Sequence, residues 1–526
     1  MVAPWPATVS GITRGRGVGD SVAQDGTANR ELLLTVIHTP PDEGPGGDTC
    51  LARYHRAMRI VIIGGGPGGY EAALVAAELG ADVTVVSDEG PGGACVLWDC
   101  VPSKTLLSSA QAFSTLETAP ALGVHFQGVP RRSVPTYEVD LPTVMERVRD
   151  LAHAQSDDIR KRLLAEGAGF VLGTGRIADP HTVGVTDGGQ VVERLDCDAI
   201  LIATGSDPRR LATAPTDGEV ILSSQDVYDL KEVPERLVVV GAGATGAEYA
   251  TAFLRFGSQV TFVVSRDRVL PAEDEDAALV IEEVFRRRGL ETVKRARAVR
   301  VERAGDGGVV HLEDGRTVEG THVLLTIGQV PQTGGLGLDE VGVRLNDRGG
   351  VVVDGVSRTS VPNIYAAGDV TGKLMLASVA AMQGRIAMWH LLGQAVSPLR
   401  WDAVAATIFT DPQIATVGLS EQRAAKADIP VLVEKLPLSS NSRAKMASLR
   451  DGFVKLLARP GSGTIVGGAV VAGYASDLIA PVSTACFNRL TASQLSQAFQ
   501  IYPSFAGSIQ ECARLLAGRV QGDYRY

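Results

Sequence analysis

The chain has 526 residues and a formal net charge of −10 at pH 7, with 45% hydrophobic and 21% charged residues. This length exceeds what one hydrophobic core supports, so we expect three or four domains. The acidic balance argues against nucleic acid as a partner. No apolar run in the sequence is long enough to span a bilayer.

The N-terminal stretch, residues 1–57, lacks hydrophobic periodicity and contains turn-forming segments such as GRGVG and TPPDEGPGGD. Its longest apolar piece, LLLTVI, is too short for the hydrophobic region of a signal peptide. We therefore expect residues 1–57 to form a disordered N-terminal extension. The folded part is expected to begin at Met58, with MRIVIIGGGPGG.

A nucleotide-binding motif follows at once. The stretch RIVIIGGGPGGYEAALVAAELGADVTVV predicts a buried strand, a glycine-rich turn, an alanine-rich helix and a second strand. In this order Gly64 permits the tight turn, Gly66 lets the backbone approach a pyrophosphate, and Gly69 allows close helix packing. The helix N-terminus then faces the diphosphate with free N–H groups.

The same pattern returns in RLVVVGAGATGAEYATAFLRFGSQVTFVV, with Gly241, Gly243 and Gly246. Two such units predict two bound dinucleotides, and the simplest pair is FAD and NAD(P)H, joined by hydride transfer. The alternative is that one unit is a relic or a glycine cluster that serves packing only.

The residues at the end of each second strand bear on the ribose contacts. In the first unit Ser87 holds the usual place of the ribose-binding acid, and Asp88 follows it, so Asp88 is assigned to the cofactor site. The second unit has Ser265 and Arg266 there; Arg266 can pair with a 2′-phosphate, and Arg268 can assist. This favours NADPH and leaves NADH open. The alternative is that Arg266 is a solvated loop charge.

The cysteines indicate the compartment. They are Cys50, Cys95, Cys100, Cys197, Cys486 and Cys512. Only Cys95 and Cys100 lie close in sequence, so the pattern is not that of a secreted disulfide framework and fits a reducing cytoplasm. On a regular helix residues five apart point about 140° away from each other, so a disulfide between them requires a distorted turn.

Five further motifs together carry a family resemblance. They are GGACVLWDCVPSK, LIATGSDPR, IGQVPQTGGLGLDEVGV, IYAAGDVTG and FTDPQIATVGLSE. With the two glycine units, they make the chain resemble the pyridine nucleotide-disulfide oxidoreductases, such as dihydrolipoyl dehydrogenase and glutathione reductase. The resemblance covers residues 58 to about 520.

The resemblance implies an α/β fold with two Rossmann-like domains, for FAD and NAD(P), and a C-terminal α+β interface domain. The implied plan is an FAD-binding domain in two parts, 58–207 and 328–398, an NAD(P)-binding domain, 208–327, and an interface domain, 399–526. It also implies a homodimer in which each active site borrows residues from the partner's C-terminal domain.

The family's site residues carry over to matching positions. Cys95 and Cys100 match the redox cysteines, Lys104 the lysine below the flavin N5, Glu248 its glutamate partner, and Asp369 the acid that binds the flavin ribitol. A cation near N5 favours the reduced, anionic flavin. Within the same motifs we place further cofactor contacts at Gly93, Thr204, Gly205, Gly328 and Gly368. No metal site is predicted.

One family feature is missing. The disulfide reductases carry a His-Pro motif and a nearby glutamate in the interface domain, where the histidine moves protons for thiol–disulfide exchange. The matching stretch is QIYPSFAGSIQE, with Tyr502 before Pro503 and Gly507 at the glutamate position. The last histidine of the chain is His390. Tyrosine, with a reference pKa of about 10, is a poor base for a thiol but can donate a hydrogen bond to a quinone oxygen.

Three interpretations of the cysteine pair stay open. The pair can be a disulfide that exchanges electrons with flavin but reduces external substrates poorly. It can also be an inherited thiol pair without a catalytic role, or a working disulfide with another proton source.

We expect an FAD-dependent NAD(P)H:quinone oxidoreductase, in which Tyr502 of the partner chain contacts the acceptor. In its Tyr-Pro variant the chain resembles an actinobacterial subgroup of the family. Members of that subgroup often lack the first cysteine, whereas this chain has it as Cys95. A dihydrolipoyl dehydrogenase-like disulfide reductase that uses Cys95 and Cys100 is therefore the alternative. A non-catalytic redox-sensing flavoprotein is the third possibility.

Overall fold

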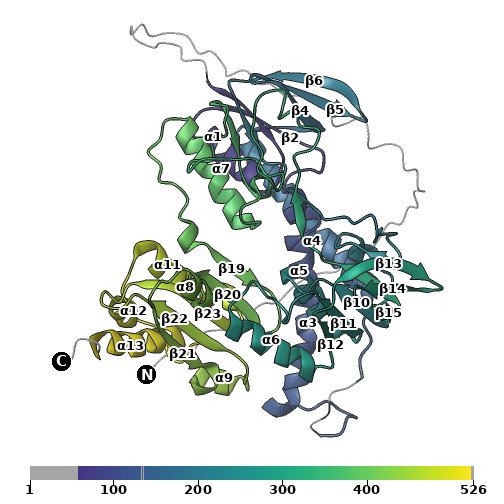
Figure 1. Ribbon diagram of the computed structural model, residues 1–526, viewed down its shortest axis with the longest axis vertical. Helices are drawn as coiled ribbons and strands as arrows, with labels where there is room; N and C mark the ends of the chain where they lie inside the picture. Colours follow the sequence, from purple (N-terminus) through teal and green to yellow (C-terminus); the bar gives the residue numbers. More distant parts are fainter. Residues whose placement is uncertain (1–56, 132, 134–135, 523–526) are drawn as a thin grey trace, which may run out of the picture. The chain divides into compact units, whose positions relative to one another are not determined.

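The structure is a computed structural model that describes residues 57–522, except residues 132, 134 and 135 (Figure 1). The N-terminal extension expected over residues 1–57 lies, apart from its last residue, outside the described residues.

The first glycine unit belongs to a parallel five-stranded sheet. In order across the sheet, its strands are β18 (Ile364–Ala366), β7 (Ala199–Ile202), β1 (Arg59–Ile63), β2 (Asp82–Ser87) and β3 (Gly169–Leu172). The helices of this part are α1 (Pro67–Glu78), α2 (Gly93–Leu97), α3 (Cys100–Thr118), α4 (Leu141–Ala165) and α7 (Ala377–Leu391). β7 is apolar throughout and β1 is apolar and buried after Arg59, as expected for strands of a parallel sheet that is covered on both faces.

The second glycine unit belongs to a second parallel five-stranded sheet. Its strands are β12 (Glu291–Lys294), β11 (Gln259–Val264), β10 (Arg236–Val240), β16 (His322–Leu325) and β9 (Ile221–Leu222), with helices α5 (Ala244–Phe256) and α6 (Glu275–Arg287). Each parallel sheet is accompanied by a three-stranded antiparallel sheet. These are β4 (Thr174–Asp179), β5 (Thr182–Asp187) and β6 (Gln190–Asp196), and β13 (Ala298–Ala304), β14 (Gly307–Leu312) and β15 (Thr317–Gly320).

The chain leaves the first sheet and returns to it. β8 (Ser206–Pro208), on the way out, pairs antiparallel with β17 (Gln329–Pro331), on the way back. β18 then pairs with β7 at the edge of the first sheet. The second sheet is therefore inserted within the first, as the two-part plan expects; the individual domain boundaries stay predictions.

The C-terminal part is built on an antiparallel five-stranded sheet. Its strands are β19 (Ala405–Ile408), β20 (Gln413–Gly418), β23 (Ile465–Ala472), β22 (Phe453–Ala458) and β21 (Leu432–Pro437). Its helices are α8 (Glu421–Lys426), α9 (Ser442–Met446), α10 (Ala475–Leu478), α11 (Ala480–Asn488), α12 (Ala492–Gln497) and α13 (Gly507–Gly522). α12 and α13 lie side by side, and α13 packs on β21 and β22 (Figure 1). The predicted fold class, two Rossmann-like units and a C-terminal α+β domain, is confirmed.

The third glycine of each motif sets how closely its helix approaches the strand before it. A Cβ atom on Gly69 would lie 1.9 Å from the Gly64 carbonyl oxygen, and one on Gly246 would lie 2.1 Å from the Gly241 carbonyl oxygen. The second glycine differs, since a Cβ on Gly243 would meet no atom within 4 Å. The third glycine therefore serves packing, and the second leaves open space in front of the helix.

No helix in the described part of the chain is both long and apolar enough to cross a membrane.

The second and third glycines of the second unit predict different effects, one on nucleotide binding and the other on stability. Gly246→Ala forces α5 away from β10, and we expect a loss of about 1–3 kcal/mol in the free energy of unfolding. Gly243→Ala should leave that free energy nearly unchanged but weaken NADP⁺ binding, because its methyl group occupies the space in front of the helix. Urea unfolding and calorimetric titration measure the two quantities; equal destabilisation by both variants contradicts the division of roles.

Candidate active site

A large cavity opens at the carboxyl ends of the strands of the first sheet. The predicted residues that line it are Gly64, Gly66, Asp88, Gly93, Cys95, Cys100, Thr204, Gly205, Gly368 and Asp369. They come from segments far apart in sequence, which the parallel sheet brings to one edge. Gly328 is not among the lining residues, and its carbonyl accepts a hydrogen bond from the Arg209 N–H at 2.9 Å.

The cavity fits a dinucleotide at its diphosphate end. Gly66 is the N-cap of α1, and no described side chain caps that helix. A Cβ atom on Gly66 would lie 4.0 Å from its nearest neighbour, so the backbone faces open space. Free N–H groups at a helix N-terminus that meets open space make a site for a phosphate group.

Two acids, and not one, lie at the end of β2. Ser87 is buried, while Asp88 and its neighbour Glu89 both line the cavity. Burial, and then the charge of Asp88, raise the pKa of Glu89. The sequence interpretation missed Glu89, although an acid next to the assigned Asp88 was visible in the stretch SDE.

Asp369 lines the cavity next to α7 and is held by a partner that the sequence interpretation missed. The Ser206 hydroxyl, on β8, donates to the Asp369 carboxylate at 2.8 Å. Burial raises the pKa of Asp369, and the hydrogen bond from Ser206 only partly offsets this. A carboxyl group that is buried and oriented in this way suits a hydroxyl-rich ligand such as the ribitol chain.

The helix that carries the two cysteines is broken between them. Cys95 lies on α2, Cys100 is the first residue of α3, and Asp99 between them departs from helical geometry, with φ −122° and ψ −89°. The break interrupts the regular helix between the two cysteines, and the two thiols lie close enough for each to shift the pKa of the other. Both are free thiols in the structure.

The two thiols differ in acidity. The hydrogen bond with Cys100 lowers the pKa of Cys95, and the charge of Lys104 lowers it further, against the effect of burial. The same hydrogen bond, together with burial, raises the pKa of Cys100. Cys95 is therefore the thiol that ionises first.

Lys104 and Glu248 form an ion pair between the two nucleotide-binding units. Lys104 Nζ, one helical turn beyond Cys100 on α3, lies 2.8 Å from Glu248 Oε2 on α5. The other carboxylate oxygen, Glu248 Oε1, accepts a hydrogen bond from the Phe409 N–H at 2.9 Å, and the Phe409 ring lies 5.0 Å from Lys104 Nζ. Neither residue of the pair lines the large cavity. The Phe409 contact uses a backbone group, so no residue type in the sequence could have revealed it.

The charge on Lys104 is secure. Burial acts to lower the pKa of Lys104, because it disfavours the charged ammonium. The Glu248 carboxylate, and then Cys100, outweigh this effect, so the pKa of Lys104 is raised. The Glu248 side chain is 7% exposed and the Lys104 side chain 31% exposed, so the carboxylate depends on the lysine more than the reverse.

The second unit leaves room for a nucleotide. Gly243 is the N-cap of α5, and no described side chain caps this helix. Ser265 and Arg266 are exposed, and no described carboxylate forms a salt bridge with Arg266. Arg268 contacts its own loop instead, with Nη1 3.4 Å from Glu275 Oε1 and Nη2 3.3 Å from the Pro271 carbonyl oxygen.

Tyr502 lies apart from these groups within the chain. It belongs to the segment between α12 and α13, and it is 83% exposed. Gly507 begins α13, and Glu511, one turn further, forms two hydrogen bonds with Arg514, at 2.7 and 2.8 Å. No described group of histidine, cysteine and acidic residues has the geometry of a metal site.

Comparison with known proteins places this arrangement in a family. The model of the pyridine nucleotide-disulphide oxidoreductases matches residues 58–384, and the model of their dimerisation domain matches residues 404–513. A protein of Mycobacterium tuberculosis named NAD(P)H dehydrogenase (quinone) is 48% identical over 467 residues, which cover 87% of this chain and 94% of the relative. The dihydrolipoyl dehydrogenase of Geobacillus stearothermophilus is 32% identical over 461 residues, covering 87% and 96%.

Solved structures of related proteins have the same fold. The crystal structure of LpdA from Mycobacterium tuberculosis superposes with a TM-score of 0.83 at 48% identity, covering 88% of this chain and 100% of that chain. The HOCl-induced flavoprotein disulfide reductase RclA from Escherichia coli gives 0.76 at 25% identity, covering 87% and 99%. The chain belongs to the pyridine nucleotide-disulfide oxidoreductases, the family that the sequence motifs predicted, and its cofactors are FAD and NAD(P)H. The roles of the individual site residues stay predictions.

The unequal acidity of the thiols predicts ordered alkylation. In the reduced protein, iodoacetamide should modify Cys95 before Cys100, and the rate at Cys95 should reach half its maximum below the free-cysteine pKa of about 8.5. Lys104→Met should move this midpoint upward, because the lysine charge lowers the pKa of Cys95. Peptide mass spectrometry across a pH series measures both; modification of Cys100 first contradicts the assignment.

The unequal burial of the ion pair predicts unequal costs. Lys104→Met leaves a buried carboxylate without its cation, and we expect a loss of about 1–3 kcal/mol in the free energy of unfolding. Glu248→Gln keeps an acceptor for the Phe409 N–H and leaves a lysine that can reach water, so it should cost less. Urea unfolding of both variants tests the order, and the reverse order contradicts it.

Proposed function

We propose that the protein is an FAD-dependent NAD(P)H:quinone oxidoreductase. The observation that carries the proposal is Tyr502 in the place where disulfide reductases of the family hold a histidine, in a chain without any histidine after His390. The name of the Mycobacterium tuberculosis relative supports the choice of acceptor. The overall reaction takes NAD(P)H, a proton and a quinone to NAD(P)⁺ and the hydroquinone.

The chain's own residues would bind and orient the reactants. When bound, FAD supplies the two-electron chemistry that links nucleotide and acceptor. Asp369, Asp88 and the N-terminus of α1 would hold it in the large cavity. Lys104, fixed by Glu248, keeps a positive charge one helical turn from Cys100 and would stabilise negative charge that develops during reduction.

The preferred nucleotide is proposed to be NADPH. Arg266 is exposed at the end of β11, where a 2′-phosphate would lie, and an arginine there can form two parallel hydrogen bonds with a phosphate group. Arg268 is held in its own loop and is assigned no direct contact.

The working form is proposed to be a cytoplasmic homodimer. Phe499, Ile501 and Tyr502 are 101%, 82% and 83% exposed within a single chain. Three large exposed side chains in one short segment suit a contact with a second protein. The segment lies in the part of the chain that matches the family's dimerisation domain, so we assign Tyr502 to the partner's active site.

A second candidate is a disulfide reductase that uses Cys95 and Cys100. The observation in its favour is that Cys100 lowers the pKa of Cys95, which suits a thiolate nucleophile. What disfavours it is the absence of a proton-transfer residue at Tyr502, because such a residue commonly contributes about 10²–10⁴-fold in rate.

Steady-state kinetics with two acceptors distinguish the candidates. We expect kcat/KM with menadione to exceed that with lipoamide by about a hundredfold or more, since the missing acid–base catalyst slows only thiol chemistry. The double variant Cys95→Ser/Cys100→Ser should keep its quinone reductase activity. A parent enzyme that oxidises NADPH faster with lipoamide than with any quinone contradicts the proposal.

The variant Tyr502→His/Gly507→Glu supplies a matched control. It restores the family's two missing residues, so it should raise lipoamide reduction, while menadione reduction should fall or stay the same because Tyr502 is replaced. If it raises neither, the missing residues do not account for the acceptor preference.

A further inference from the structure

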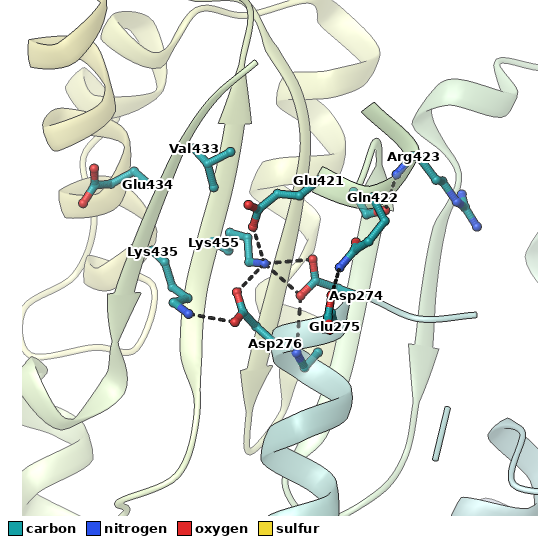
Figure 2. Close-up of polar contacts among 12 residues, drawn as sticks. Asp274, Glu275, Asp276, Glu421, Gln422, Arg423, Val433, Glu434, Lys435 and Lys455 are labelled. Carbon is teal, nitrogen blue, oxygen red and sulfur yellow. Dashed lines mark hydrogen bonds and ion pairs between the residues drawn. The ribbon is translucent and has the colours of Figure 1, made fainter. Parts of the chain in front are cut away.

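A buried lysine of the C-terminal sheet reaches into the nucleotide-binding unit. Lys455 lies on β22 and is 1% exposed. Its Nζ atom lies 2.9 Å from Asp274 Oδ1, 2.6 Å from Asp276 Oδ2 and 2.7 Å from Glu421 Oε1 (Figure 2). Asp274 and Asp276 belong to the start of α6, and Glu421 to α8, so the lysine joins two parts of the chain.

Lys455 keeps its charge in this cluster, but the cluster is not an obvious source of stability. Burial acts to lower the pKa of Lys455, and the hydrogen bonds with Asp276, Glu421 and Asp274 reverse this, so its pKa is raised. Lys435 adds a second cation, 2.8 Å from Asp276 Oδ1. Buried ion clusters cost much desolvation, and apolar residues of the same size often give equal stability. Their clearer contribution is a defined geometry.

That geometry is imposed on the loop that carries Arg266. The loop runs from Ser265, after β11, to Asp274, which caps α6 by accepting from the Ala277 N–H at 3.3 Å. Midway along it, the Leu270 N–H donates to the Ala242 carbonyl at 2.9 Å, within the glycine loop Gly241–Gly243. The loop therefore touches the place where the nucleotide diphosphate is expected.

The same loop holds a strained residue. Leu270 has φ 51°, in the left-handed region that a leucine rarely adopts, and it is 1% exposed. Such a conformation persists only where the surrounding structure fixes it. Lys455 fixes the end of the loop through Asp274, four residues beyond Leu270.

We propose that Lys455 is a positioning residue for the NAD(P)H site. By holding Asp274, it sets the position of the loop 265–274 and, through it, of Arg266 and the glycine loop. The inference rests on the proposed contact of Arg266 with the 2′-phosphate. It also means that the sheet of the family's dimerisation domain helps to shape the nucleotide site.

Four variants of the FAD-loaded enzyme test the inference. Lys455→Met removes the charge, and Lys455→Arg keeps it. Asp274→Asn removes the negative charge that Lys455 binds and one of its two acceptor oxygens, but keeps the helix cap, since asparagine caps as well as aspartate. Glu421→Gln is the matched control, because Lys455 then still holds Asp274 and Asp276.

The readouts are the Kd of NADP⁺ and of NAD⁺ by calorimetric titration, the melting temperature, and kcat with menadione at saturating NADPH. We expect Lys455→Met and Asp274→Asn to weaken NADP⁺ binding by about tenfold, with a smaller effect on NAD⁺ and an unchanged kcat. Lys455→Arg and Glu421→Gln should bind both nucleotides as the parent does, whatever their melting temperatures.

Two outcomes overturn the inference. In one, Glu421→Gln weakens nucleotide binding in parallel with Lys455→Met and in proportion to the fall in melting temperature, so the cluster only stabilises the fold. In the other, Asp274→Asn binds NADP⁺ as tightly as the parent. The second test stands even if Lys455→Met does not fold, because in Asp274→Asn the lysine keeps two carboxylate partners.

Failure of the proposed 2′-phosphate contact gives a different result. An Arg266→Ala variant would then bind NADP⁺ as tightly as the parent does. Lys455→Met would still weaken NAD⁺ binding through the glycine loop.

Discussion

The arrangement of the site depends on one buried carboxylate. Glu248 lies on α5, beside the second glycine motif, yet one of its oxygens binds Lys104 of the first nucleotide-binding unit and the other accepts from the Phe409 backbone. A carboxylate 7% exposed cannot exchange these partners for water, so it requires both at once. The contact therefore fixes α3, α5 and the start of the C-terminal sheet relative to one another.

A second carboxylate supports the same junction further along the two helices. Asp411 Oδ2 accepts from Ser114 of α3 at 2.8 Å, from Arg255 of α5 at 2.8 Å and from Arg288 at 2.9 Å. Burial acts to raise the pKa of Asp411, and Arg288 and Arg255 lower it below its usual range. Phe409 and Asp411 are two residues apart, so one short segment of the C-terminal domain holds both helices.

Whether a feature could be predicted from the sequence depends on whether it arises from local residue patterns or from contacts between distant segments. The glycine motifs encode local geometry, and both Rossmann-like units lie where these motifs predicted them. The family motifs predicted the pairing of Lys104 with Glu248, although the residues lie 144 positions apart. Ser206 and the Phe409 amide were missed because each acts through a tertiary contact between segments with no shared pattern. Glu89 was missed although it directly follows Asp88 in the sequence. The break at Asp99 was expected only as a distorted turn, since helix periodicity gives no means of placing a break.

The contacts of the C-terminal domain divide into two groups that can change independently. Phe409, Asp411 and Lys455 act within one chain and hold the nucleotide-binding units in place. Tyr502 and its exposed neighbours Phe499 and Ile501 form no side-chain hydrogen bond or ion pair with these groups in the described part of the chain. A change of histidine to tyrosine at position 502 therefore removes a proton carrier without disturbing the Lys104–Glu248 pair. This separation explains how a chain can keep both glycine motifs and the Lys104–Glu248 pair of the family and still carry tyrosine where disulfide reductases carry histidine.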